Sequence, residues 1–305
     1  MAIARNLKLR IMATTDLHGH VLSWNYDTHQ IAPARGLSRV ASLIARARAE
    51  VENALLFDDG DFLNGSGLSA AVMSNFSDPS GHPMVLAMNH LRYDAVAVGN
   101  HEFSHGTAFL RTAMAPANFP LICSNFHFSG LDFILPHVLL TRDLRDDFGE
   151  IHQIKIGVLA LLPQQTLVWE ARHLTGIATA APMRSVAHST VQHLRDGGAD
   201  IVVALVHSGY DPDLDTEHED SFAKYVSQIA GIDAVLAGHS HKVFPETVGQ
   251  VADLAIVSAG FYGSHLGVID LELQGDALGW HVIKRHSAVQ AVAARHGAAT
   301  ACTAL

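Results

Sequence analysis

The chain has 305 residues, of which 49% are hydrophobic and 16% are charged, so it is long enough to bury one large core or two modest ones. This composition excludes an intrinsically disordered chain, and no apolar run reaches the roughly 18 residues that a membrane-spanning helix needs. The formal net charge of −10 argues against a tight nucleic-acid binder, because DNA and RNA are themselves strongly negative.

The N-terminus contains neither the apolar segment nor the cleavage site of a signal peptide. As written, the chain is expected in the cytoplasm; if an export signal has been removed from the sequence, the expected compartment is the periplasm. The two cysteines, Cys123 and Cys302, are too few for a disulfide framework.

Histidine is unusually frequent, with 21 residues, more than lysine and arginine together. We expect most of these histidines to be surface residues at positions where lysine is more common. Four that we assign to this group are His29, His127, His188 and His193.

The predicted elements alternate between strands and helices along the chain. In the first half, strands are expected at 7–11, 54–58, 95–98 and 121–123, and helices at 36–52, 82–91 and 105–114. In the second half, strands are expected at 132–140, 153–162, 201–206, 233–236, 254–258 and 266–273, and helices at 182–198 and 221–229. This alternation predicts an α/β domain with helices on both faces of its sheet structure.

Five of the predicted strands end in a short loop that carries Asp, Asn or His. Each loop alone fits a turn or a helix cap. The carboxyl ends of strands form the ligand crevice of open α/β sheets, so the five loops are expected at one edge. The segments are Asp16-x-His18, Gly60-Asp61, Gly99-Asn100-His101, His207 and Gly238-His239-x-His241.

Together, these loops predict a site for two divalent cations, because a turn does not require histidine at both i and i+2. Mixed carboxylate, imidazole and amide ligands favour Mn, Fe, Zn, Co or Ni over Mg or Ca. One carboxylate must bridge two ions that lie roughly 3.5–4 Å apart. Asp61 is the natural bridge, since Gly60 before it allows close approach of the backbone.

The five segments together resemble the five-part signature of the calcineurin-like metallophosphoesterases. Their flanks, including 14–18, 60–66 and 263–267, are similar to the N-terminal domain of bacterial 2',3'-cyclic-nucleotide 2'-phosphodiesterase/3'-nucleotidases, a branch of the 5'-nucleotidase-like enzymes. The resemblance covers residues 7–280 and implies a four-layer α/β/β/α sandwich. We therefore expect a catalytic domain at residues 1–285, followed by an Ala-rich tail at residues 286–305.

The resemblance also implies a role for each site residue. Asp16, His18 and His241 would hold the first metal, and Asp61 would bridge. The second metal would be held by Asn100, His207 and His239. His101 matches the family's catalytic histidine, which is not a ligand and would stabilise the transition state or protonate the leaving oxygen.

The implied activity is hydrolysis of 2',3'-cyclic nucleotides and 3'-nucleotides by a water that two cations share, with a small nucleotide or phosphoester as substrate. The chain departs from the family in two features that bear on which substrate it takes: the loop at residues 64–67 and the second domain. The family usually has Gln where Asn64 stands and Ser-Pro where Ser66-Gly67 stands. Members of the branch usually also have a second, base-stacking domain, which is not expected within these 305 residues.

Other interpretations therefore stay open. One is a 5'-nucleotidase, a nucleotide-sugar hydrolase or a generic phosphodiesterase. Another, from a different class, is a non-catalytic, histidine-rich metal-binding module.

Four further residues lie near the predicted site in the sequence. We expect Glu102 to orient a ligand or its loop, and His105 to start a helix and not to bind metal. His265 is expected either at the rim of the site or as a loop histidine with a backbone partner, and His20 is not assigned.

Overall fold

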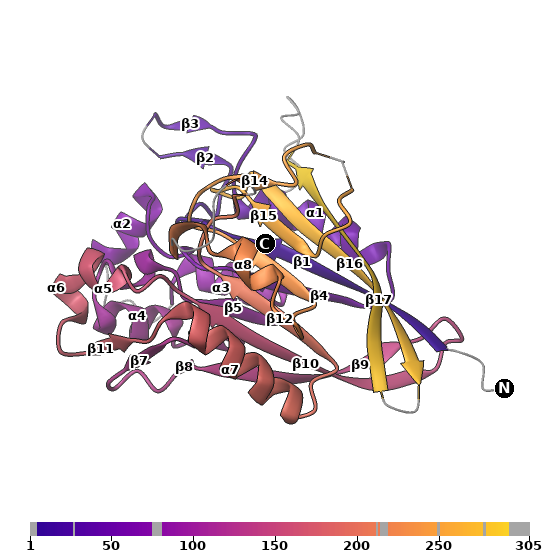
Figure 1. Cartoon of the computed structure of the whole chain (residues 1–305). Coiled ribbons are helices and arrows are strands. Elements are labelled where there is room, and N and C mark those ends of the chain that lie inside the picture. The colour runs from indigo at the N-terminus through magenta and orange to yellow at the C-terminus, as the bar shows by residue number, and fades with distance from the viewer. Residues whose placement is uncertain are drawn as a thin grey trace.

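The computed structural model describes residues 5–26, 28–74, 81–211, 213, 219–248, 251–276 and 279–292. Two β-sheets occupy the middle of the molecule, and helices lie on their outer faces (Figure 1). None of the described helices is both long and apolar enough to cross a lipid bilayer.

The first sheet has seven strands. Its centre is parallel, from β1 through β4, β5 and β6 to β8, and β16 and β17 extend it antiparallel beyond β1. In spatial order the strands are β17 (Gly279–Ala291), β16 (His265–Asp276), β1 (Arg5–Thr14), β4 (Ala54–Asp58), β5 (Ala95–Ala97), β6 (Leu121–Ile122) and β8 (Ile134–Leu135).

The second sheet has six strands, of which β10, β12, β13 and β15 are parallel and the two edge strands are antiparallel. In spatial order they are β14 (Val243–Phe244), β15 (Ile256–Ala259), β13 (Ala234–Ala237), β12 (Ile201–Val206), β10 (Ile151–Leu161) and β9 (His137–Arg145). Two small sheets pair β2 (Trp24–Asn25) with β3 (Gln30–Ile31), and β7 (Phe126–Phe128) with β11 (Ala178–Ala180).

The two large sheets pack face to face over one hydrophobic core. Alternate residues of β1, such as Leu9 and Ile11, and alternate residues of β12, such as Val203 and Leu205, are buried in this same core. β12 is apolar throughout because its other face is buried as well, as expected for a parallel strand covered on both sides.

Helices complete the outer layers. Buried residues of α1 (Leu37–Ala49), α3 (Pro83–Leu91) and α4 (Thr107–Met114) belong to one outer core, on the first sheet. Those of α7 (Met183–Asp196) and α8 (Ala223–Ser227) belong to another, on the second sheet. The predicted α/β/β/α order of layers is confirmed. The remaining helices are α2 (Gly67–Ser74), α5 (Thr166–Trp169), α6 (Ala171–Leu174) and the 3-10 helices η1 (Asn100–Phe103) and η2 (Glu219–Ser221).

The predicted elements differ from the structure in two instructive places. The strand expected at 132–140 is two strands, because Pro136 interrupts the ladder where the chain passes from β8 in the first sheet to β9 in the second. The helix expected at 221–229 is one short turn, α8, preceded by η2.

The C-terminal strand β17 was not predicted at all. It pairs with β16 from Asp276↔Gly279 to His265↔Ala291, so the boundary expected at residue 285 falls inside a strand. Its polar residues hide the period-2 signal, because it is an edge strand of which most residues are only partly buried or exposed. The rest of the expected tail, 293–305, lies outside the described residues, as does Cys302; Cys123 is a buried free thiol.

Candidate dimetal site

The structure brings all of the predicted site residues together at one edge of the sandwich. The first sheet supplies Asp16 and His18 after β1, Asp61 after β4, and Asn100 and His101 after β5. The second sheet supplies three histidines from the loops after β12 and β13: His207, His239 and His241. In both sheets these are the carboxyl ends of parallel strands, as the sequence predicted.

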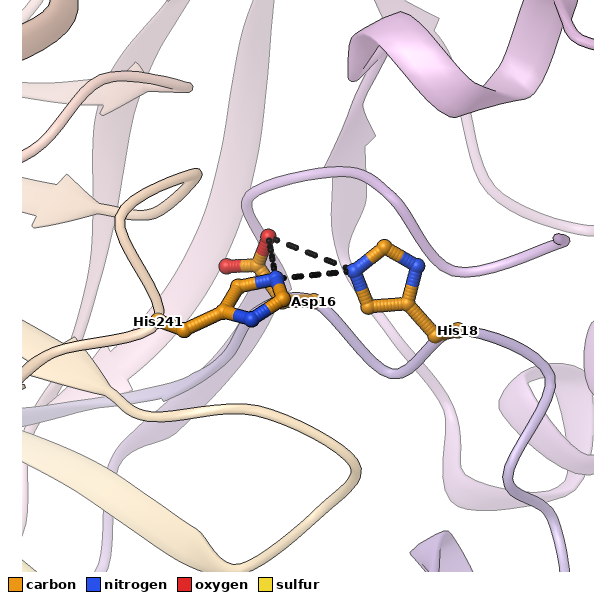
Figure 2. Close-up of side chains that lie close together, drawn as sticks. All are labelled: Asp16, His18 and His241. Atoms are coloured by element: carbon orange, nitrogen blue, oxygen red, sulfur yellow. Dashed lines mark hydrogen bonds and ion pairs between the residues drawn. The ribbon is translucent and has the colours of Figure 1, made fainter. Parts of the chain in front are cut away.

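Asp16, His18 and His241 form one compact group, with a potential ligand atom from each lying within 4.8 Å of the others. The Nε2 atoms of the two imidazoles lie 3.5 Å (His241) and 3.8 Å (His18) from the same Asp16 oxygen, Oδ1. Figure 2 shows both rings directed at this carboxylate from opposite sheets. The three residues could therefore surround a single cation.

Asp61, His207 and His239 form a second group within the same 4.8 Å limit. Oδ2 of Asp61 lies 3.2 Å from Nε2 of His207 and 4.0 Å from Nε2 of His18, which belongs to the first group. Asp61 thus lies between the two groups, where a bridging carboxylate is needed.

Asn100 and His101 complete the cluster. The side chain of Asn100 is buried, and its Oδ1 has no hydrogen-bond partner among the described residues. The backbone N–H of His101 donates to Oδ1 of Asp61 at 2.7 Å, and the His101 ring meets the His18 ring edge-on with centroids 5.3 Å apart. His101 is only partly buried, as a group that meets a substrate should be.

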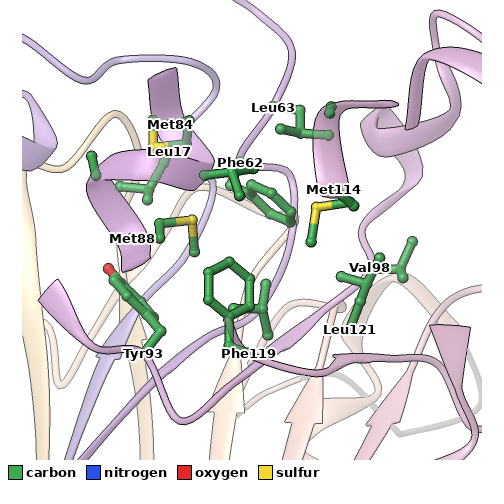
Figure 3. Close-up of a cluster of buried hydrophobic side chains, with 14 of the residues drawn as sticks. Leu17, Phe62, Leu63, Met84, Met88, Tyr93, Val98, Met114, Phe119 and Leu121 are labelled. Atoms are coloured by element: carbon green, nitrogen blue, oxygen red, sulfur yellow. The ribbon is translucent and has the colours of Figure 1, made fainter. Parts of the chain in front are cut away.

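The ligand loops are anchored in the core beneath them. Leu17, between two predicted ligands, is fully buried, and so are Phe62 and Leu63 directly after Asp61 (Figure 3). Phe103 anchors the loop of Asn100 and His101 in the same core. Truncating one of these aromatic rings would cost about 3–5 kcal/mol of stability, so each loop is held firmly.

The backbone at the site adopts an unusual conformation. Among described residues other than glycine, eight have positive φ, and five of them are predicted ligands. Such a conformation costs of the order of 1–3 kcal/mol per residue and persists only where the surroundings enforce it. The five are Asp16 (51°), His18 (45°), Asp61 (56°), His239 (65°) and His241 (58°).

Backbone hydrogen bonds between loops enforce these conformations. The N–H of Asp16 donates to the carbonyl of Gly60, and the N–H of His18 donates to the carbonyl of Asp61. The N–H of His239 donates to the Asp16 carboxylate, at 3.0 Å from Oδ2. The loops therefore hold one another, and the strain is concentrated where the ligand atoms converge.

Two histidines are oriented by backbone carbonyls. Nδ1 of His18 lies 2.8 Å from the carbonyl oxygen of Asn64, and Nδ1 of His207 lies 2.7 Å from that of Asp59. A carbonyl only accepts, so both imidazoles carry a proton on Nδ1, and Nε2 is the atom that each ring turns toward the site. Metal-ligating histidines are usually oriented in this way.

The charged groups of the site perturb one another strongly. Burial lowers the pKa of His18, and burial followed by the proximity of His207 lowers that of His239. Burial acts to lower the pKa of His207 as well, but the Asp61 carboxylate raises it well above its usual value. The pKa of His241 is raised by its hydrogen bond with Asp16. Without cations, histidine protons therefore balance part of the carboxylate charge.

Glu102 has the orienting role that the sequence predicted. Its buried carboxylate accepts four backbone N–H groups, with Oε2 bonded to Gly99 and Asp61 and Oε1 bonded to Phe62 and Leu63, all at 2.7–3.0 Å. Burial raises the pKa of Glu102 to about 7. One carboxylate thereby ties the Asn100 loop to the Asp61 loop.

The residues fit a pair of metal ions. Asn100 Oδ1 is buried and has no hydrogen-bond partner among the described residues. Burying such an atom unpaired costs about 1–3 kcal/mol, a cost that metal coordination would remove. The oxygen and imidazole donors suit divalent transition metals.

The structure also places His20, which the sequence left unassigned, His105, which lies two residues before α4, and His265, which is the first residue of β16. His20 is buried and stacks on Tyr262 at 3.9 Å, with Nδ1 3.0 Å from the His18 carbonyl, so it supports the ligand loop. His105 directs Nε2 to Oδ1 of Asn64, 2.8 Å away. His265 pairs with the hydroxyl of Ser264 at 2.9 Å. The four histidines expected on the surface are all exposed.

Sequence reasoning missed three residues that contact the site. The Trp169 ring stacks on His239 with centroids 5.2 Å apart, and the Phe261 ring stacks on His241 at 4.7 Å. Glu170 accepts a hydrogen bond from Ser104, which lies beside His101. Local sequence carried no signal for these contacts, because each joins residues at least 20 positions apart in the chain.

The four-layer α/β/β/α sandwich places two adjacent Asp/His groups, each of which could hold a metal ion, at the carboxyl ends of its strands. The chain matches the calcineurin-like phosphoesterase family over residues 9–243, and it belongs to this family.

Several named proteins are similar to this chain over most of its length. The 2',3'-cyclic-nucleotide 2'-phosphodiesterase/3'-nucleotidase of Salmonella typhimurium is 34% identical over 297 residues, which cover 92% of this chain and 45% of the relative. The protein of the same name from Yersinia enterocolitica is 33% identical over 295 residues, with the same coverage. The chain thus spans about half the length of these relatives. The crystal structure of the calcineurin-like phosphoesterase YfkN from Bacillus subtilis superposes with a TM-score of 0.88 at 28% identity, covering 94% of this chain and 91% of that one.

Proposed function

We propose that this chain hydrolyses phosphoesters with the help of two divalent metal ions, and that its substrates are 2',3'-cyclic nucleotides and 3'-nucleotides. The observation that carries this proposal is the position of Asp61 between two groups of imidazole and carboxylate ligands, with His101 beside both. The substrate class is supported by the names of relatives that cover 92% of this chain.

The proposed ligands divide as the geometry groups them. Asp16, His18 and His241 would hold one ion, and Asp61 would contact both. Asn100, His207 and His239 would hold the other. Mn, Fe, Zn, Co or Ni suits this donor set. Two bound cations would lower the pKa of a water between them and offset negative charge on the phosphoryl oxygens.

The chain's own residues would do the remaining work. The buried loops fix the ligands before the substrate arrives, so little reorganisation is needed during reaction. His101, partly exposed at the edge of the cluster, would meet the leaving oxygen and donate a proton to it as the P–O bond breaks.

The test is a parallel assay of purified, Mn²⁺-loaded protein against 2',3'-cAMP, 3'-AMP, 5'-AMP and bis-p-nitrophenyl phosphate. We expect selective turnover of the first two, lost in His101→Ala and retained in His188→Ala, an exposed histidine far from the site. Turnover of 5'-AMP alone would replace the proposal by a 5'-nucleotidase, and turnover of the aryl ester alone by a generic phosphodiesterase. Metal binding with no turnover of any ester would indicate a non-catalytic module.

A further inference from the structure

A chain of two hydrogen bonds links His101 to a carboxylate that lies far away in the sequence. Nδ1 of His101 lies 3.1 Å from Oγ of Ser104, and Oγ of Ser104 lies 2.9 Å from Oε1 of Glu170. His101 belongs to η1 and Ser104 follows it directly, whereas Glu170 joins α5 to α6. All three side chains are partly buried, so water screens the contacts only in part.

The direction of these hydrogen bonds follows from their chemistry. An ionised carboxylate only accepts, so the Ser104 hydroxyl donates its one hydrogen to Glu170. The hydroxyl oxygen is then left to accept from His101, and Nδ1 of His101 must carry a proton. The other ring nitrogen, Nε2, is the one left for a substrate.

The segment that carries Glu170 is held against the site at two other points. Trp169, next to Glu170, stacks on the ring of His239 at 5.2 Å. His173 of α6 packs so closely on Gly106 that a Cβ there would lie 3.1 Å from its Nδ1. The α5–α6 turn is therefore fixed to the loop that carries His101, and the Glu170 carboxylate has a defined position.

We propose that Glu170, acting through the Ser104 hydroxyl, is a positioning residue for His101. It keeps the Nδ1 proton in place and thereby holds the ring with Nε2 toward the leaving oxygen. In the step itself, the oxygen of a water molecule bonds to phosphorus and releases a proton to solvent, the P–O bond to the leaving group breaks, and the proton on Nε2 moves to the leaving oxygen. The imidazole is left neutral, with its remaining proton on Nδ1 still bonded to Ser104. This inference rests on the proposed function.

The chain of hydrogen bonds from His101 through Ser104 to Glu170, called the relay below, should affect the reaction differently from a merely structural contact. A ribose hydroxyl is a far weaker acid than p-nitrophenol, so its departure as an alkoxide needs a proton, whereas p-nitrophenolate leaves without one. Removing the relay should therefore slow esters of ribose selectively. General acid catalysis contributes about 10²–10⁴-fold, and an indirect positioning residue should supply part of it.

The experiment compares Ser104→Ala, Glu170→Gln and the double variant with 3'-AMP and bis-p-nitrophenyl phosphate as substrates, metal content being measured in each sample. We expect kcat on 3'-AMP to fall about tenfold to a hundredfold with KM and metal content unchanged, and kcat on the aryl ester to change less than about threefold. The double variant should be no worse than either single one. Ser104→Thr, which keeps the hydroxyl, should restore activity, and Ser185→Ala on α7 is the matched control.

Equal losses on both substrates, or no loss on either, would overturn the proposal. A second readout does not depend on turnover: ¹⁵N NMR of the ring of His101, assigned with His101→Ala. It should show a proton on Nδ1 in the parent protein and a shift toward the Nε2–H tautomer in Ser104→Ala. An unchanged tautomer would refute the relay. If the parent protein hydrolyses no nucleotide, the proposed function fails, and the NMR result still decides the relay.

Discussion

Nε2 of His18 lies 3.0 Å from Nε2 of His241, although the two residues are 223 positions apart in the sequence. Two ring nitrogens that face each other at this distance can share one proton or one cation, but they cannot both carry a proton. Nδ1 of His18 already gives its proton to the carbonyl of Asn64, so its Nε2 presents a lone pair. The pair is therefore arranged to share a positive ion with Asp16, which lies beside both.

The first prediction concerns metal stoichiometry. His241→Ala should reduce the tightly bound metal from two ions to one ion per chain, because it removes a ligand from only one of the two groups. Metal content after dialysis, measured by plasma mass spectrometry, checks this. His188→Ala should keep both ions, and an unaltered content in His241→Ala would exclude His241 as a ligand.

The second prediction concerns Gly238, the residue before His239. A Cβ at this position would lie 2.3 Å from the Thr15 hydroxyl and 3.1 Å from the Asp16 carboxylate, so alanine must push the ligand loops apart. We expect Gly238→Ala to weaken metal binding at least tenfold, the usual size of an effect on residues that position ligands. Metal titration followed by calorimetry measures it.

Gly197→Ala is the matched control for this change. Gly197 lies at the end of α7, far from the site, and has an ordinary helical φ of −71°. A Cβ there would come no closer than 3.3 Å to any neighbour. This variant should bind metal as the parent protein does, and a loss of equal size in both variants would mean that the loop around Gly238 has no special role.

The third prediction concerns the carboxylate that ties two ligand loops together. Glu102→Gln keeps the size of the side chain but replaces one acceptor oxygen by an NH₂ group, which would face two backbone N–H donors. Leaving such donors unpaired costs about 1–3 kcal/mol each, so the metal-free protein should unfold at lower urea concentration. Glu272→Gln on the exposed part of β16 should leave the midpoint unchanged. A midpoint that stays unchanged in Glu102→Gln as well would contradict the prediction.

The fourth prediction concerns the pH dependence of stability. His82 caps α3 by accepting the N–H of Met84 at Nδ1, and burial, with a smaller effect of His105, lowers its pKa from 6.5 to about 4. The unfolded chain therefore binds the proton more tightly than the folded chain between these values. The contribution of His82 to the free energy of unfolding is fully present above pH 6.5. It is lost as the pH falls toward 4, by about 3 kcal/mol at most.

His82→Asn tests this contribution, because asparagine caps a helix without titrating. Between pH 6.5 and 4, the free energy of unfolding should fall less steeply in the variant than in the parent protein. Other buried histidines also contribute to the slope; burial lowers the pKa of His20, for example, to about 4. Identical slopes in the two proteins would show that folding does not lower the pKa of His82.

Much of the fold could be predicted because its signals are local. The apolar stretch 201–206 is β12 to the residue, and Ala54–Asp58 is β4 to the residue. The proline before α7 and the glycines after it mark that helix as predicted. Edge strands were harder: β17 carries polar residues on its exposed face, and only its pairing with β16 makes it a strand.

The sequence by itself determined which residues gather at this edge of the sandwich. Each predicted ligand stands directly after a strand, and parallel strands bring their carboxyl ends to one edge, so a local pattern predicted a cluster formed by distant segments.

Only the tertiary structure decided the distances within and between the two groups of candidate ligands, and which residues support these groups from outside. Glu170, Trp169 and Phe261 reach the site through contacts between segments far apart in the chain, and their neighbours in sequence give no sign of it. Such contacts depend on how two sheets and their loops pack, which is a property of the whole fold and not of any local pattern.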